Sequence, residues 1–395
     1  MEIKHVLAAV LLTGAVAAPA SAAQRAVLYS GHGEAVDGSY VVVLHPGQDT
    51  AAARSLVTRS GRVEHTYTSA LHGFSVRATP AAARSLAADP RVAYVAQDLV
   101  VRLPDAVSAR EVVVQPDPPS WGLDRIDQRS LPLDANYHHA NTAPDVRAYV
   151  VGTGIRYSHH EFGGSAVPGV DAVGGVTPPG GDCNGHGTHM AGTVGGQSTG
   201  VAKDVTLVSV RVLDCSGAGS YSQVLAGVDW LTRDSGGRPS VALMSPGGSF
   251  YRPLNDAITA SINANVHYSV ISGASGANAC DFSPGSTPLA TTVGATDRTD
   301  AKTSWSNHGG CIDVWAPGAQ ITSAWGTADD VYAVISGATA SAHAAGAAAL
   351  WRQRFPTDPA TAVADALRAN ATPGVIGGLA PDSPNLLLFT GAVPS

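Results

Sequence analysis

The chain of 395 residues carries little charge of either sign. Only 14% of its residues are charged, and 24 Lys and Arg stand against 31 Asp and Glu, which gives a formal net charge of −7. A nucleic-acid-binding face requires an excess of basic residues, so this balance argues against nucleic acid as a partner. A hydrophobic fraction of 44% with so little charge also excludes a disordered chain and predicts a large core.

Long hydrophobic runs are absent as well. No stretch reaches the roughly 18 apolar residues that a membrane-spanning helix needs. The run Val6–Leu12 is shorter, follows Lys4 and precedes Ala20-Ser21-Ala22, a small-x-small cleavage pattern. These features predict a secretory signal peptide over residues 1–22 rather than a membrane anchor. We therefore expect a secreted, extracellular protein with no membrane partner.

Cysteines are few, and none forms a C-x-x-C pair. The four are Cys183, Cys215, Cys280 and Cys311. Without a C-x-x-C pair a zinc site is disfavoured. An even number in an exported chain favours two disulfides over free buried thiols, and the sequence alone allows three pairings.

The length corresponds to two or three folding units, without internal repeats or low-complexity tracts. Residues 23–103 are predicted to form a small α+β domain. Its expected strands are 40–44, 71–76 and 92–95, and its expected helices are 51–59 and 80–88. Residues 104–119 contain four prolines and no core pattern, so they are predicted to be a linker and processing region.

Residues 120–395 show a different pattern, in which short apolar strands alternate with helices. The expected strands are 146–151, 205–213, 241–245 and 266–272, and the expected helices are 187–195, 221–233, 254–263 and 338–354. This alternation predicts an α/β fold with a mostly parallel, doubly wound sheet that has helices on both faces. In such folds, functional sites lie beyond the carboxyl ends of the strands.

The segment 184–192, Asn-Gly-His-Gly-Thr-His-Met-Ala-Gly, is the most informative for chemistry. Glycines flank His186 where a loop enters a helix, a placement that suits a general base. His186 and His189 are three residues apart and lack the i, i+4 spacing of a zinc-peptidase helix. For His189, a buried structural histidine is the alternative interpretation.

This segment resembles the histidine motif of the subtilisin-like serine peptidases (subtilases), in particular the proteinase K branch. Other stretches resemble that branch as well: 120–126, 211–215, 283–284, 292–295, 316–318 and 336–337. The resemblance implies an inhibitory propeptide over residues 23–103 and a subtilisin-like peptidase domain over 120–395. It further implies the disulfides Cys183–Cys215 and Cys280–Cys311, a peptide or protein ligand, the chain's own propeptide as a partner, and a monomer.

At two motif positions the chain has other residues than the family's catalytic aspartate and serine. The aspartate of the D-T-G motif corresponds to Gly152, and neither Asp145 nor Asp182 is a good substitute. The family's serine motif reads G-T-S-M-A-T-P-H. The corresponding segment of this chain, residues 337–343, is one residue shorter. Alignment on Gly337 puts Thr339 at the serine position, whereas alignment on His343 puts Ala338 there. The extra methyl group of Thr339 restricts its side chain and crowds the path of attack, and an internal threonine lacks the chain-terminal amine that threonine nucleophiles use as a base. A structural role for Thr339 is therefore favoured over a nucleophilic one.

The oxyanion site and the peptide groove are also altered. Ala274 stands at the position of the family's oxyanion asparagine. The resemblance implies a groove between Gly217-Ala218-Gly219 and a second segment, in which Ser245, Gly247 and Gly248 are the expected contacts. Pro246 lacks an N–H, so this second edge is expected to pair more weakly.

A structural calcium ion is a further implication of the resemblance. The matching ligands are the carbonyls of Pro288 and Ala290 and the carboxylate of Asp313, and oxygen ligands of this kind suit Ca²⁺. A plain surface aspartate is an equal alternative for Asp313. No catalytic cofactor is expected.

Two functions remain open from the sequence. The first is a pseudopeptidase that binds peptide or protein with little or no hydrolysis, because the aspartate, serine and asparagine are all replaced. The second is an active serine-type endopeptidase with a rebuilt site that uses Thr339 and His186 and cleaves extracellular proteins.

Overall fold

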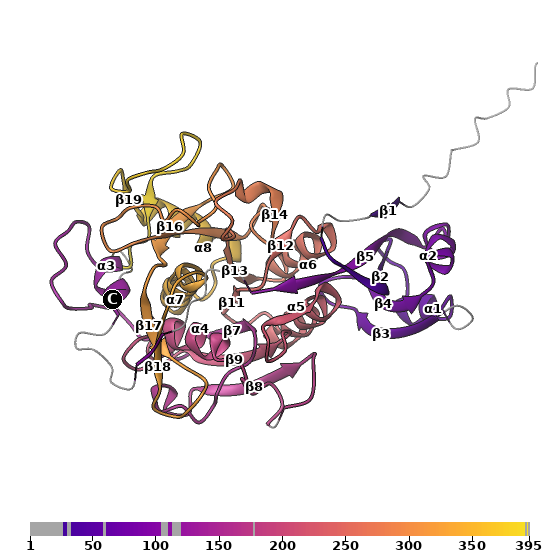
Figure 1. Ribbon diagram of the computed structural model, residues 1–395, viewed down its shortest axis with the longest axis horizontal. Helices are drawn as coiled ribbons and strands as arrows, with labels where there is room; N and C mark the ends of the chain where they lie inside the picture. Colours follow the sequence, from indigo (N-terminus) through magenta and orange to yellow (C-terminus); the bar gives the residue numbers. More distant parts are fainter. Residues whose placement is uncertain are drawn as a thin grey trace, which may run out of the picture.

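The computed structural model describes residues 27–29, 33–57, 61–103, 110–112, 120–176, 178–391 and 393. They form a small amino-terminal domain and a larger carboxyl-terminal domain, which lie side by side in Figure 1. The predicted signal peptide, residues 1–22, lies outside the described residues. Of the predicted linker, residues 104–119, only the backbone of strand β6 (Arg110–Val112) is described, and it pairs antiparallel with β18 (Tyr332–Ile335).

The small domain is a twisted sheet with two helices on one face. The strand order is β1-β5-β2-β4-β3, and β1 pairs parallel with β5. The elements are β1 (Val27–Tyr29), β2 (Ala35–Leu44), α1 (Thr50–Arg54), β3 (Gly61–Tyr67), β4 (Gly73–Ala78), α2 (Pro80–Ala87) and β5 (Val92–Arg102). The predicted α+β domain is confirmed, although the helix expected over 51–59 ends at Arg54 and β3 was not predicted.

Strand β2 lies between two hydrophobic cores, which explains why its apolar run is continuous. Tyr40, Val42 and Leu44 pack into the small domain's own core below α1 and α2. Val41 and Val43 point to the opposite face and join the core of the large domain. Successive side chains of a strand alternate between faces, so a sheet that is covered on both sides requires an unbroken apolar sequence.

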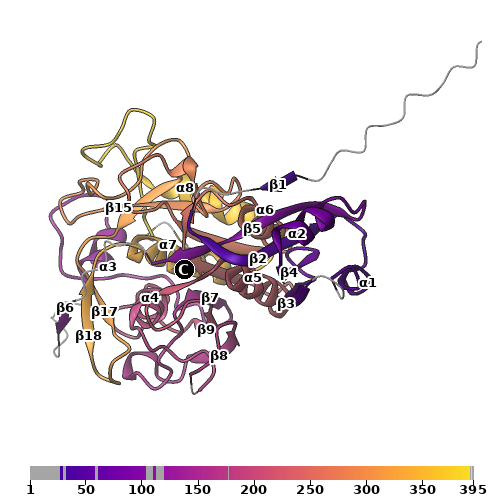
Figure 2. The ribbon, with the colours of Figure 1, turned by 45° about the vertical axis from the view of Figure 1, so that its right-hand side comes forward.

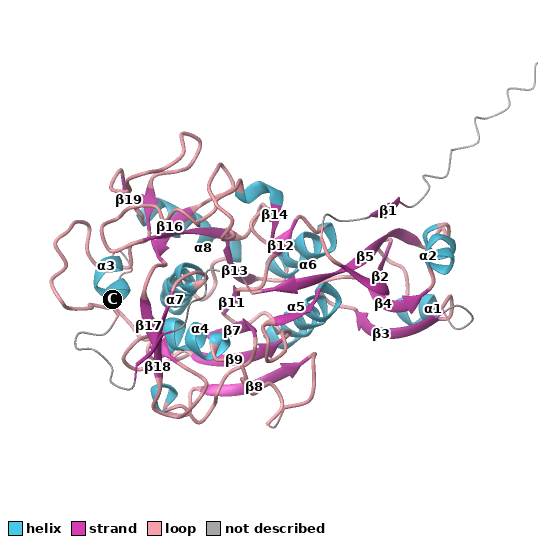
Figure 3. Ribbon diagram, in the orientation of Figure 1, coloured by secondary structure: helices cyan, strands magenta, loops and turns pink. Residues whose placement is uncertain are grey.

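The large domain is built on a nine-stranded sheet of order β19-β20-β16-β15-β13-β11-β7-β9-β8, in which only β19 is antiparallel to its neighbour. Its strands are β7 (Arg147–Gly152), β8 (Ala166–Asp171), β9 (Thr206–Arg211), β11 (Ser240–Met244), β13 (Val266–Ile271), β15 (Thr291–Thr296), β16 (Val314–Pro317), β19 (Thr372–Pro373) and β20 (Leu386–Leu387). Helices cover both faces of this sheet, as Figure 3 shows. The predicted parallel, doubly wound α/β fold is confirmed.

The two faces are covered by different helices. Ala148 and Val150 of β7 share a core with α4 (His186–Gly195) and α7 (Thr339–Arg354), whereas Tyr149 and Val151 share one with α5 (Tyr221–Ser235) and α6 (Arg252–Asn263). Helix α7 is buried along nearly its whole length, because its alanines let it approach the sheet closely. The remaining elements are α3 (Trp121–Ile126), α8 (Ala360–Asn370), the short helices His160–Phe162 and Ala279–Asp281, and strands β10 (Ala218–Ser220), β12 (Gly248–Ser249), β14 (Phe282–Ser283) and β17 (Ile321–Ala324).

The small domain rests on α5 and α6, and Figures 1 and 2 agree on this placement. Oδ1 of Asp229 on α5 accepts hydrogen bonds from three successive backbone N–H groups, those of residues 68–70, at 2.6–2.9 Å. The hydroxyl of Tyr94 donates to Asp256 on α6 at 2.7 Å. The buried carboxylate of Asp98 accepts from the backbone N–H of Ser222, in the first turn of α5. These contacts place β5 against the groove described below.

Candidate active site

His186 is the first residue of α4, and a loop held by Asp182 presents it. The carboxylate of Asp182 accepts five hydrogen bonds at 2.6–3.0 Å. The donors are the Thr153 hydroxyl, the N–H groups of Asn184, Gly185 and Thr188, and the Thr188 hydroxyl. Asp182 is therefore fully used in shaping the loop and does not orient the imidazole.

The helix start also requires a glycine beside His186. A Cβ at Gly187 would lie only 2.1 Å from the carbonyl oxygen of Gly154, so no other residue fits without movement. The N–H of Gly187 donates to the Thr153 hydroxyl at 2.9 Å. This contact fixes the start of α4 against the carboxyl end of β7, where Gly152 lies.

The imidazole of His186 is buried and unpartnered. Within the described part of the chain, neither of its ring nitrogens has a hydrogen-bond partner, and the side chain is fully buried. Burial lowers the pKa of His186 to about 4, and the nearby charge of Asp182 only partly opposes this effect. At neutral pH the ring is therefore uncharged, with nothing to fix its tautomer or stabilise its protonated form.

Gly152 offers no carboxylate to this ring. A Cβ placed on Gly152 would lie 3.2 Å from Oγ of Ser245, and no other non-neighbouring heavy atom of the described residues comes within 4 Å. Oγ of Ser245 donates instead to the carbonyl of Val151 at 2.9 Å. Asp145 precedes β7, at the end opposite to Gly152, and accepts a hydrogen bond from Gln353 at 3.0 Å.

The hydroxyl of Thr339 points into the protein interior. Thr339 is fully buried, and its Oγ1 donates to the carbonyl of Gly318 at 3.2 Å. A small cavity beside the start of α7 is lined by Ala338, Ala340 and Ser341 but not by Thr339. The geometry thus favours Ala338 for the family's serine position, and the assignment of Thr339 to it stays a prediction that these contacts do not support. Oγ of Ser341 is committed to the carbonyl of Ala338 at 2.7 Å.

Ala274 lines the same cavity and has no side-chain donor. Its loop is held by Asn307, which sequence reasoning did not identify and which no local pattern marks. The Asn307 amide donates to the carbonyl of Ser272 at 2.8 Å, and its Oδ1 accepts from the N–H groups of Ser275 and Ala277. The loop that carries Ala274 is therefore held by three hydrogen bonds to Asn307, and its place as the family's oxyanion loop stays a prediction.

The predicted groove holds a strand of the small domain. Strand β5 pairs antiparallel with β10, in which Ala218 faces Arg102 and Gly219 faces Val101. The N–H of Leu103 donates to the carbonyl of Gly217 at 2.9 Å. On the other side, Arg102 forms a single bridge with Gly247.

The two edges of the groove thus differ in how many residues they pair with β5. The edge at β10 forms a ladder of three residues, while the edge after Pro246 contributes one bridge. Ser245 is buried below this second edge, and Gly248 pairs with Ser283 of β14 instead. The effect expected from Pro246, which lacks an N–H, stays a prediction.

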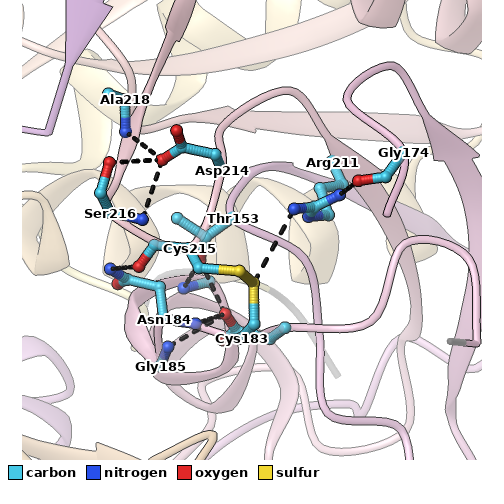
Figure 4. The surroundings of a disulfide bond; sticks show 12 residues. Thr153, Gly174, Cys183, Asn184, Gly185, Arg211, Asp214, Cys215, Ser216 and Ala218 are labelled. Carbon is cyan, nitrogen blue, oxygen red and sulfur yellow. Dashed lines mark hydrogen bonds between the residues drawn. A yellow bond between two sulfur atoms is a disulfide. The ribbon is translucent and has the colours of Figure 1, made fainter. Parts of the chain in front are cut away.

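Both predicted disulfides are confirmed, as Cys183–Cys215 and Cys280–Cys311. The first joins the His186 loop to the turn before β10 (Figure 4). In the same view, Asn184 Nδ2 donates to the carbonyl of Cys215 at 3.0 Å, and Arg211 donates to the carbonyl of Gly174. The histidine loop and the main groove edge are therefore cross-linked covalently.

The three expected calcium ligands lie near the amino-terminal ends of two neighbouring strands, since Pro288 and Ala290 precede β15 and Asp313 precedes β16. The Asp313 carboxylate, however, is ion-paired with Arg368, whose Nη1 lies 2.6 Å from Oδ1. As they stand, these residues do not fit a calcium ion, because the guanidinium already balances the carboxylate. Elsewhere in the described residues, no group of three or more His, Cys, Asp or Glu side chains is arranged to hold a metal.

Comparison with known proteins gives the same family as the motifs. Residues 149–385 match the family described as "Subtilase family". The chain belongs to the subtilase family. Residues 39–104 match "Peptidase inhibitor I9", the intramolecular inhibitor of subtilases, which identifies the small domain as a subtilase propeptide.

Similar subtilases include secreted and alkaline enzymes. The chain is 44% identical to the "Extracellular serine proteinase" of Thermus sp. (strain Rt41A), over 94% of each chain. It is 42% identical to the "Alkaline serine exoprotease A" of Vibrio alginolyticus, over 74% of this chain and 54% of that one. A crystal structure of a cold-adapted subtilisin-like serine proteinase superposes with a TM-score of 0.67 at 44% identity, covering 69% of this chain and 98% of that one. In the described part of this subtilase, no helix is long and apolar enough to span a bilayer.

Proposed function

We propose that this protein is a secreted subtilase homologue that binds peptide or protein and hydrolyses it little or not at all. The observation that carries the proposal is the isolation of His186, whose two ring nitrogens lack partners inside a buried site. A general base of this kind needs a carboxylate behind it and a hydroxyl in front of it. Gly152 supplies no carboxylate, and Ala338 supplies no hydroxyl.

The size of the defect follows from the missing groups. In serine peptidases with this triad, loss of the carboxylate costs roughly 10⁴-fold in rate. Loss of one oxyanion donor costs roughly 10²–10³-fold. These effects do not add, because loss of the nucleophile alone removes most of the acceleration. Near-background hydrolysis is therefore expected.

The occupied groove supports a binding function. The pairing of β5 with β10 supports the inference that this edge accepts an extended segment as an added strand. Because the site lacks the groups for self-cleavage, residues 23–395 are expected to stay covalently connected. An external ligand then competes with the chain's own propeptide for the groove.

A revertant series tests this function. We would compare wild type with Gly152→Asp/Ala274→Asn/Ala338→Ser, using cleavage of labelled casein and the intact mass of protein purified from a protease-deficient host. The matched control adds His186→Ala to the revertant. Activity and propeptide cleavage in the revertant alone, lost again in the control, are the expected result.

The rival function, an active endopeptidase, has distinct outcomes in the same experiment. Casein cleavage by wild type that disappears in Thr339→Ala would overturn the proposal, as would a fluorophosphonate label on Thr339. A second revertant with Thr339→Ser in place of Ala338→Ser separates the two alignments, and we expect it to be inactive because the Thr339 side chain points to Gly318.

A further inference from the structure

We propose that Arg368 serves as a built-in cation on Asp313, in the place that a calcium ion takes in relatives, so that this chain is stable without the metal. The resemblance of the sequence to calcium-holding subtilases predicts an ion at the carbonyls of Pro288 and Ala290 and the carboxylate of Asp313. The structure puts a guanidinium on that carboxylate instead. This inference is independent of whether the protein hydrolyses peptides.

Asp313 is held so that one of its oxygens faces a cation. Its backbone N–H donates to the carbonyl of Thr292 at 2.9 Å, and its Oδ2 accepts from the N–H of Thr292 at 2.8 Å. Thr292 is only two residues after Ala290, so the carboxylate lies beside the loop that carries the two expected carbonyl ligands. Its Oδ1 can therefore accept a hydrogen bond from a partner outside β15 and β16.

A half-buried carboxylate in this position needs a positive charge. The side chain of Asp313 is only 20% exposed. Without a cation, the carboxylate would be poorly solvated and only partly compensated.

Arg368 meets this need from a separate helix. It lies in the last turn of α8, 55 residues after Asp313, and its Nη1 is 2.6 Å from Oδ1. Its other terminal nitrogen donates to Asp365 in the preceding turn of the same helix. The carboxyl end of a helix is also a favourable position for a positive charge.

The ion pair and a calcium ion exclude each other. Calcium binds carboxylate oxygens at about 2.3–2.6 Å, so an ion on Oδ1 would lie within about 5 Å of the guanidinium. Two like charges at that distance beside a poorly solvated carboxylate repel strongly. The arginine therefore replaces the ion rather than assisting it.

Thermal unfolding with and without calcium tests the proposal on the full chain. Wild type is expected to have the same Tm in excess EDTA and in millimolar CaCl2. Arg368→Ala is expected to have a lower Tm in EDTA and to gain about 5 °C or more at calcium concentrations roughly 100 times its Kd. Isothermal titration calorimetry should detect calcium binding to Arg368→Ala that is absent from wild type.

Three further variants assign the effect to this site. Asp313→Asn in the Arg368→Ala background should abolish the calcium gain, whereas Arg368→Lys should behave as wild type. Arg298→Ala, which removes an exposed arginine outside the ion pair, should show no calcium response. If Arg368→Ala folds only when calcium is supplied, that also supports the replacement.

Two results would overturn the inference. One is a calcium-dependent rise in the Tm of wild type that disappears in Asp313→Asn, because the ion would then bind alongside Arg368. The other is a folded Arg368→Ala variant, verified by circular dichroism, whose Tm does not respond to calcium. The first result is decisive even if Arg368→Ala does not fold at all.

Discussion

Replacing Gly152 by aspartate should restore the missing partner of His186 and raise the pKa of its imidazole. Among the described residues a Cβ there meets only Oγ of Ser245, at 3.2 Å, a tight contact that a small shift of the Ser245 hydroxyl relieves. That hydroxyl now donates to the carbonyl of Val151 and lies close enough to donate to a new carboxylate instead. The substitution therefore needs little rearrangement of the end of β7.

The expected shift follows from the present environment of the ring. Burial holds the pKa of His186 at about 4. An opposite charge within hydrogen-bond reach raises a pKa by roughly 1–3 units, which gives a value of about 5–7. At about 1.4 kcal/mol for each unit, the new carboxylate would stabilise the imidazolium by roughly 1.4–4 kcal/mol.

A histidine NMR titration measures this directly. The Cε1–H resonance of His186, assigned by its loss in His186→Gln, would be followed from pH 3 to 8, the range set by the roughly 1–3 unit shift. Gly152→Asn is the matched control, since it has the same shape without the charge and should leave the pKa near 4. Equal pKa values in the aspartate and asparagine variants would refute the argument that the end of β7 is where the histidine lost its partner.

Three other predictions concern the propeptide, acid stability and the cross-link. Asp229→Ala should weaken the docking of the propeptide by about 2–4 kcal/mol, because three N–H groups lose their acceptor. Faster hydrogen exchange over residues 61–70, with unchanged exchange in α4, would demonstrate the weaker docking. Burial lowers the pKa of His343 to about 4. The stability that comes from keeping this histidine uncharged is therefore complete above about pH 6.5 and falls by about 3 kcal/mol as the pH approaches 4. The urea midpoint of His343→Gln should then depend less steeply on pH than that of wild type. Replacing Cys183 and Cys215 by serine opens a loop of 32 residues and should cost about 3–4 kcal/mol, so an unchanged guanidinium midpoint would contradict it.

Part of the secondary structure of the large domain was predictable from local patterns, whereas strands β8, β15, β16, β19 and β20 and helix α8 were not predicted. The apolar run 146–151 became β7, and the alanine-rich segment 338–354 became the buried helix α7 from Thr339 onward. Both signals come from residues close together in the chain, whose periodicity and small size act over one strand or one helix. The strand β3 was missed because half-buried residues such as those of Gly61–Tyr67 show no clean alternation.

The sequence by itself determined the family and, through that resemblance, the two disulfide pairs, and it predicted that Gly152 and Ala274 stand at the positions of the family's aspartate and asparagine. These are matters of residue identity at a motif position. The tertiary structure alone decided that Ala338 rather than Thr339 faces the cavity, because a one-residue deletion leaves the alignment open until the helix start is seen.

The contact of Arg368 with Asp313 also required the tertiary structure. The two residues are 55 positions apart on different elements, so nothing in the local sequence of either one marks the other as its partner. Sequence patterns record what a residue can do, whereas charge balance between distant residues depends on how strands and helices pack. For this protein, the residue at a motif position could be read from the sequence, and the contact between two distant side chains could be recognised only in three dimensions.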